Sequence, residues 1–144
     1  MNTIALWVEE LTGDRQVKRE GIVFSDVAVV RMLIDGEDVE SSAHLGDEVL
    51  VYFDELEKSV GASGNYLIFT CVCGMAEDGG WDGVKVVLSE GVVTWELEVG
   101  GRVLLFSFNR DEYVSEIRSA RAMLDTTALP VEPQKVGFPK GFHR

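Results

Sequence analysis

Apolar and polar residues alternate along several short stretches of the chain, a pattern typical of half-buried β-strands. In the first stretch, Ile4, Leu6 and Val8 share one face. Asp35-Gly36 is a tight-turn signal, so a hairpin or a sharp exit is expected there. The strands expected before this turn are Thr3–Leu11, the weaker Gln16–Phe24, which Gly21 interrupts, and Val27–Ile34.

The stretch after the polar loop Glu37–Gly46 allows two interpretations. Apolar residues recur there at helical spacing, at Val49, Tyr52, Phe53, Leu56 and Val60. This spacing predicts an amphipathic helix, with Asp47 as its N-cap and Gly61 at its end. The alternative is a strand over Glu48–Phe53, because these residues are also β-prone. We prefer the helix.

The most strongly β-prone run of the chain is Asn65–Gly74, which also contains the only two cysteines. We expect a central strand at Tyr66–Val72. Short turns rich in glycine separate the apolar stretches that follow, and such close spacing predicts an antiparallel meander. The expected further strands are Trp81–Leu88, Val92–Val99 and Arg102–Phe108.

A second helix is expected over Glu112–Leu124, with Asn109 as its N-cap. Its apolar stripe consists of Tyr113, Ile117, Ala120 and Leu124. All three prolines follow it, so residues 126–144 are expected to form an irregular tail. The sequence therefore predicts a single α+β domain over residues 1–125, with an antiparallel sheet of about five to seven strands and two helices.

The net charge of −12 is unevenly distributed. Twelve acids and a single base, Lys58, lie between Met32 and Val84. Such a field repels phosphate backbones and attracts basic proteins, so a basic protein partner is expected and a nucleic acid is not. The alternative is that the acidic surface serves only solubility. No apolar run is long enough to span a bilayer, and the first residues lack a basic signal region, so a cytoplasmic location without membrane contact is expected.

Cys71 and Cys73 form the first candidate site. Side chains at i and i+2 of a strand share a face, but their Cα atoms lie roughly 6.5–7 Å apart, beyond easy disulfide bridging. A tetrahedral zinc site would need two more ligands, and only His44 and His143 are available as soft ligands. The alternatives are a metal site, a redox pair and, as the preferred interpretation, apolar packing in a strand.

Two acidic loops form the second candidate site. Their spacing does not match a calcium loop, and neither histidine lies in a recognisable catalytic motif. We therefore expect no enzyme activity, no catalytic residue, no metal and no cofactor. Trp81 at the edge of the second loop is a candidate interface anchor. Seven residues are expected to bind a partner, namely the acids of the two loops and this anchor: Asp35, Glu37, Asp38, Glu77, Asp78, Trp81 and Asp82. Glu40 also lies in the first of these loops.

The central run carries a family resemblance. Tyr66-x-x-Phe69-Thr70-Cys71-x-Cys73-Gly74, followed by Trp95, Phe106-x-Phe108 and Tyr113, resembles a group of small acidic bacterial proteins. Some members resemble immunity proteins of polymorphic or contact-dependent toxin systems. The resemblance covers about residues 65–120. Members often carry a further cysteine after this motif, where this chain has Met75-Ala76-Glu77-Asp78, so a metal site is not carried over.

Three hypotheses follow from these observations. The preferred one is a non-enzymatic immunity protein that neutralises a basic bacterial toxin through an acidic surface. The second is a small metal-binding or thiol-dependent module that uses Cys71 and Cys73. The third is a structural or assembly subunit whose acidic face only maintains solubility.

Overall fold

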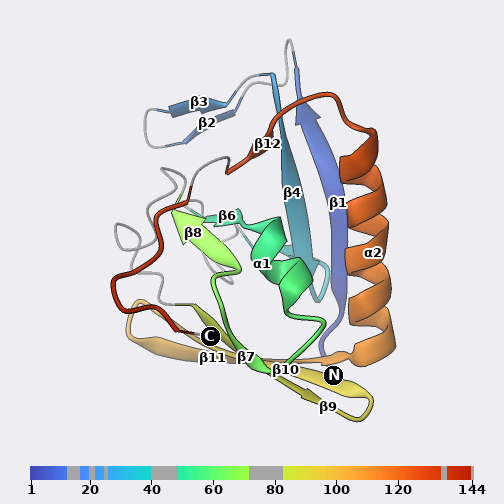
Figure 1. The fold of residues 1–144 in the computed structure, drawn as a ribbon, viewed down its shortest axis with the longest axis vertical. Coiled ribbons are helices and arrows are strands. Elements are labelled where there is room, and N and C mark those ends of the chain that lie inside the picture. Colours follow the sequence, from blue (N-terminus) through green and yellow to red (C-terminus); the bar gives the residue numbers. More distant parts are fainter. Residues whose placement is uncertain are drawn as a thin grey trace.

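The architecture is that of an α+β protein with mostly antiparallel sheets. The computed structural model describes residues 1–12, 17–19, 22–24, 26–39, 49–71, 83–133 and 136–143. Within these residues it contains twelve strands and two helices (Figure 1). The α+β class is confirmed, but the strand number exceeds the predicted five to seven. The strands also form four sheets rather than one.

The first of the two larger sheets is built around β4 (Val27–Ile34), which pairs antiparallel with β1 (Ile4–Leu11). Both predicted strands are confirmed. The turn after β4 has a positive φ at Asp35 (55°) and Gly36 (80°), and it leads into β5 (Glu37–Asp38) as a two-residue hairpin. The weaker candidate over 16–24 is two short strands that pair with each other, β2 (Val17–Arg19) and β3 (Ile22–Phe24).

The second larger sheet is the predicted meander, in the order β11-β10-β9-β7. Two-residue turns join the three strands that come last in the chain, and positive φ values at Gly91, Gly100 and Gly101 permit these turns. Figure 1 shows this sheet at the bottom of the molecule, viewed nearly edge-on. Its strands are β7 (Gly64–Tyr66), β9 (Val84–Ser89), β10 (Val92–Val99) and β11 (Arg102–Asn109).

The prediction of one continuous central strand over 66–72 is wrong, because two strands of different sheets share this stretch. The chain leaves β7 at Tyr66, passes through Leu67 and Ile68, and enters a different sheet as β8 (Phe69–Cys71). Residues 66–70 are all buried, so the run does not alternate between a buried and an exposed face. An uninterrupted apolar run of this kind suits a segment that crosses the core between two sheets.

The predicted helix over residues 49–60 is wrong in its first part. Residues 49–51 form β6 (Val49–Val51), which pairs antiparallel with β8, as the β-prone alternative implied. Helix α1 (Phe53–Lys58) follows, with Tyr52 at its N-cap position instead of Asp47. It ends before Ser59 rather than at Gly61. Pairing with β8 therefore overrides the helical spacing of the apolar residues.

The second helix, α2 (Arg110–Thr126), is longer than predicted but has the predicted cap and stripe. The Asn109 side chain accepts a hydrogen bond from the Glu112 backbone N–H at 3.0 Å. The helix runs along β1 (Figure 1), and Glu116 Oε1 accepts a hydrogen bond from the Leu6 N–H at 2.9 Å. A carboxylate of α2 thus satisfies a backbone donor of β1. The buried stripe consists of Tyr113, Ile117, Ala120 and Leu124.

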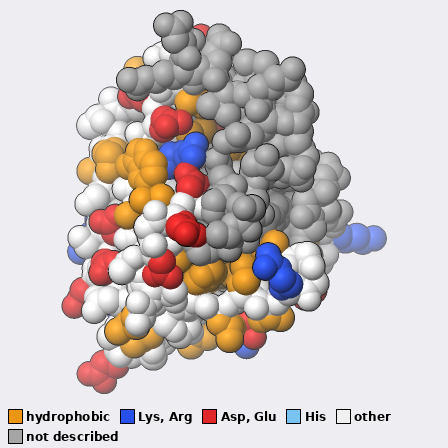
Figure 2. Space-filling view, turned by 180° about the vertical axis from the view of Figure 1, so that it is seen from behind, with side chains coloured by type: hydrophobic (Ala, Val, Ile, Leu, Met, Phe, Trp, Pro, Cys, Tyr) orange, Lys and Arg blue, Asp and Glu red, His pale blue; other side chains and the backbone are white. Residues whose placement is uncertain are grey.

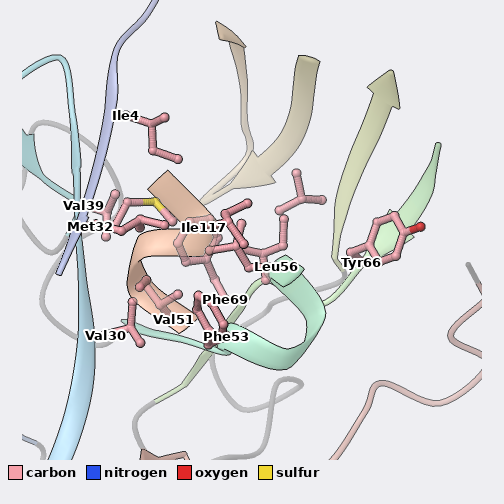
Figure 3. Close-up of a cluster of buried hydrophobic side chains, with 14 of the residues drawn as sticks. Ile4, Val30, Met32, Val39, Val51, Phe53, Leu56, Tyr66, Phe69 and Ile117 are labelled. Atoms are coloured by element: carbon pink, nitrogen blue, oxygen red, sulfur yellow. The ribbon is translucent and has the colours of Figure 1, made fainter. Parts of the chain in front are cut away.

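The core lies between the two larger sheets, α1 and α2, and Figure 3 shows part of it. Trp95 on β10 stands at its aromatic centre, with edge-on contacts to Phe69, Phe108 and Tyr113 at centroid distances of 5.9, 5.0 and 6.0 Å. Trp95 is therefore a core residue. After α2 the chain does not stay irregular, because β12 (Val131–Glu132) pairs parallel with β4.

Candidate functional site

The acidic turn between β4 and β5 contains three of the predicted binding residues. Asp35 is engaged internally, since its carboxylate accepts hydrogen bonds from the Asn2 side chain at 2.6 Å and from the Thr3 N–H at 2.8 Å. Asp38 forms an ion pair with Arg31. Glu37 is exposed. The structure thus brings these three acids together, but two of them support the fold.

The other predicted binding residues, Glu77, Asp78, Trp81 and Asp82, lie outside the described residues, as do Glu40, His44 and Cys73. The backbone of Cys71 belongs to β8 and lies opposite Val49. Among the described residues, no group of three or more His, Cys, Asp or Glu side chains is arranged to hold a metal ion. The acidic surface is also dispersed, because Asp and Glu side chains are scattered over the described part of the face in Figure 2.

A buried polar network joins α1, α2 and β10. The Tyr113 hydroxyl lies 2.6 Å from Ser59 Oγ and accepts a hydrogen bond from Trp95 Nε1 at 3.3 Å. Ser59 Oγ in turn donates to the Leu56 carbonyl. Burial raises the pKa of the Tyr113 hydroxyl to about 12, although its hydrogen bonds with Ser59 and Trp95 oppose the shift. A neutral hydroxyl with no exposed surface suits a structural role rather than proton transfer to a ligand.

A buried carboxylate lies beside Leu67, where the chain crosses from one sheet to the other. Glu55 on α1 is fully buried, and its Oε1 accepts a hydrogen bond from the Leu67 N–H at 3.1 Å. Its Oε2 lies 3.4 Å from the Lys58 ammonium nitrogen. The carboxylate therefore holds the backbone where the chain changes sheets, and this contact gives it a structural function.

A cleft of about 380 Å³ lies between α1, the end of α2 and β12, with Arg121 on its wall. Arg121 donates to both carboxylate oxygens of Glu57, at 2.9 and 3.0 Å, and its guanidinium lies 5.0 Å from the centre of the Phe53 ring. The hydrogen bonds to Glu57 raise the pKa of Arg121 above its ordinary value. The guanidinium thus joins the two helices and is already saturated with carboxylates.

The side of the β11-β10-β9-β7 sheet that faces away from the core is the strongest candidate site. We call it the outer sheet face. Figure 1 shows no labelled element below it. Cross-strand pairs place Leu105 opposite Glu96, and Val103 opposite Glu98. Lys85 lies on the far side of Glu96. The outer sheet face consists of Asn65, Lys85, Val87, Thr94, Glu96, Glu98, Val103, Leu105 and Ser107.

Apolar side chains on this face are unusually exposed. Leu105 is 70% exposed and Val103 is 60% exposed, whereas Val87 on the inner strand β9 is 41% exposed. Two shallow depressions of about 290 and 400 Å³ lie on the two sides of the Lys85–Glu96 row. Orange apolar side chains are visible along the lower edge in Figure 2, where this sheet lies. Exposed aliphatic groups that lie together with polar residues at their rim are typical of a protein-binding surface.

Sequence analysis did not single out the outer sheet face, although a signal was present. A half-exposed strand alternates apolar and polar residues, yet Val103, Leu104, Leu105 and Phe106 are all apolar. The positions that pair with Glu98 and Glu96 would be expected to be polar if that face only met water. Their apolar character is the departure from alternation that could have indicated the site.

The described residues form an α+β protein in which they cover only one side of the β11-β10-β9-β7 sheet. No protein-family model, no curated protein and no solved structure matches the chain. Within the described residues, no helix is long and apolar enough to cross a membrane.

Proposed function

We propose that this chain is a non-enzymatic protein-binding domain whose outer sheet face docks a basic protein. The observation that carries the proposal is the exposure of Leu105 and Val103, at 70% and 60%, on the centre of a strand. Burying two such side chains contributes about 1.5–3 kcal/mol each, which is enough to act as an anchor at the centre of an interface.

The charge of the surrounding surface specifies the partner. Lys85 offsets Glu96 across the sheet, so Glu98 beside Val103 leaves this face net negative. The chain as a whole carries a charge of −12. Two copies of this chain would repel each other, whereas a basic partner would be attracted and its encounter accelerated.

The acidic turn fits the same proposal. Asn2 donates its backbone N–H to the Ser107 carbonyl at 2.7 Å, and its side chain bonds Asp35 at 2.6 Å. The β4–β5 turn and the end of β11 are therefore adjacent at Asn2. A partner that covers the outer sheet face near Ser107 would meet the exposed Glu37 at its rim.

Within this class we propose an immunity protein that neutralises a basic bacterial toxin. Support comes from the acidic charge and from the resemblance around Cys71 and Trp95. An acidic inhibitor would occupy the basic surface that a nuclease toxin presents to phosphates. A cytoplasmic location and a role for Glu77, Asp78, Trp81 and Asp82 at the interface belong to the same proposal.

The test is co-expression with the product of the neighbouring open reading frame, which the proposal expects to be a basic protein. We expect rescue of growth, a complex that co-purifies, and an association rate that falls steeply as salt rises from about 0.05 to about 0.5 M. Reversal of charge in Glu98→Lys is expected to slow association. The matched control is Glu90→Lys, an exposed acid in the β9–β10 turn. Equal association rates for the two variants would contradict docking at the outer sheet face.

A further inference from the structure

The backbone of β11 has one edge that faces away from β10. The Ser107 carbonyl accepts from the Asn2 N–H at 2.7 Å, and the Ser107 N–H donates to Asn2 Oδ1 at 2.9 Å. Both backbone groups of Ser107 therefore point away from β10. Because backbone groups alternate in direction along a strand, those of Leu105 and Val103 point the same way. Leu104 and Phe106 then direct their groups to Leu97 and Trp95 on β10.

Among the described residues, Asn2 covers this edge, and it does so at Ser107 and Phe108. At its other end, β11 begins directly after the Gly100-Gly101 turn. The edge around Val103 and Leu105 therefore lies between this turn and the part that Asn2 covers. Leu105 and Val103 are 70% and 60% exposed, as is expected where one side of a strand carries no neighbour.

The sequence of this edge lacks the devices that keep edges from pairing. Edge strands commonly carry a proline, an inward charge or a central lysine. Residues Val103–Phe106 contain none of these, and the only charge within β11 is Arg102 at its start. The apolar edge over Val103–Phe106, next to the acidic residues of β10, is suited to accept a further strand.

We propose that the basic partner adds an extended strand to β11 through the backbone groups of Val103 and Leu105, an inference that rests on the proposed function. The charges beside the edge determine which side chains the added strand is expected to carry. Two strand spacings amount to about 10 Å, a gap that a lysine or arginine side chain on the added strand and a glutamate side chain on β10 close together when the basic stem lies over an aliphatic neighbour. Basic residues on the outer side of the added strand would therefore cross Val103 and Leu105 to reach Glu98 and Glu96.

A second copy of the chain is the competing occupant. The charge of −12 on each copy counts against it, because two such copies repel each other.

The first test is amide hydrogen exchange resolved by residue in the free protein. The N–H groups of Leu104 and Phe106 serve as internal controls, since both face β10. We expect at least tenfold faster exchange at Val103 and Leu105 than at these controls. Equal protection at all four positions would show that the edge is already covered and would overturn the proposal.

The second test adds a synthetic heptapeptide of alternating lysine and valine at millimolar concentration. Protection of the Val103 and Leu105 amides is expected to rise at least fivefold, and a peptide in which glutamate replaces lysine should have no effect. Chemical-shift changes at Val87 and Thr94 without protection of these amides would overturn strand addition while leaving docking on the face intact. Absence of any change with the lysine peptide would also overturn strand addition.

The third test separates the backbone from the side chain. Val103→Ala and Val103→Pro both remove the valine side chain, but only proline removes the outward N–H. We expect the proline variant to weaken binding of the lysine peptide at least tenfold beyond the alanine variant. Equal binding by two folded variants would contradict the proposal. If Val103→Pro does not fold, Leu105→Pro against Leu105→Ala provides the same comparison.

Discussion

Asn2 donates a side-chain hydrogen bond to Asp35 at 2.6 Å and thereby ties the start of the chain to the β4–β5 turn. The Thr3 N–H also donates to this carboxylate, at 2.8 Å. Asp35 itself adopts a positive φ of 55°, which aspartate and asparagine tolerate better than most residues. An acid that sequence analysis assigned to partner binding therefore has a structural task.

This relationship predicts that Asp35→Ala lowers the free energy of unfolding by about 1–3 kcal/mol, because two donors lose their acceptor and alanine tolerates the positive φ poorly. Asp35→Asn keeps an acceptor oxygen and should cost less. Urea denaturation at neutral pH measures both values. Glu37→Lys is the control, since Glu37 is exposed and should change stability little. Equal stability of Asp35→Ala and the parent chain would contradict this role.

Tyr113 predicts a pH dependence at alkaline pH. Burial raises the pKa of its hydroxyl from 10.0 to about 12, so the folded state holds the proton more tightly than the unfolded state. The stability that this group contributes is fully present below pH 10 and is lost as the pH rises towards 12. The loss amounts to roughly 2–3 kcal/mol by pH 12. Tyrosinate absorbance and unfolding curves between these pH values measure it.

The matched variant is Tyr113→Phe. At neutral pH it should lower the free energy of unfolding by about 1–3 kcal/mol, because the buried Trp95 N–H loses its acceptor. In alkaline solution the variant should lose less stability than the parent chain with rising pH. A parallel pH dependence for the two proteins would show that Tyr113 does not titrate as its burial implies.

Glu55 predicts a graded effect of substitution at the crossing segment. Glu55→Ala removes the acceptor for the buried Leu67 N–H and should cost about 2–4 kcal/mol. Glu55→Gln keeps an oxygen at that position and loses only the charge facing Lys58, which is largely exposed, so its cost should be smaller. Thermal unfolding ranks the two variants. The reverse order would assign the stabilisation to the ion pair instead of the hydrogen bond.

Sequence alone predicted the elements whose order is set by local signals. The turns Asp35-Gly36 and Gly100-Gly101, the Asn109 cap and the stripe that begins at Tyr113 were all found, because each depends on neighbours within a few residues. The meander followed from such turns. The α+β class was therefore accessible without tertiary information.

The predicted secondary structure is wrong where contacts with residues distant in sequence determine the local conformation. Residues 49–51 carry a helical spacing, yet they form a strand because residues 69–71 lie beside them. The run over 66–72 is apolar throughout and so does not indicate where it changes sheets. The partner-binding role of all seven predicted residues stays a prediction, although Asp35 and Asp38 also bond within the chain. The outer sheet face required the pairing of β10 with β11 before its exposed residues could be grouped.

The central claim is that the outer sheet face is the docking surface. Leu105→Thr tests it most directly, because threonine keeps β-propensity while removing most of an apolar side chain that is 70% exposed. Met123→Gln on α2 is the control, since Met123 is an exposed apolar residue at 37% on another element. Titration calorimetry with the basic partner should show Kd raised at least tenfold, about 1.4 kcal/mol, for Leu105→Thr and unchanged for Met123→Gln. An unchanged Kd for a folded Leu105→Thr variant would contradict the account.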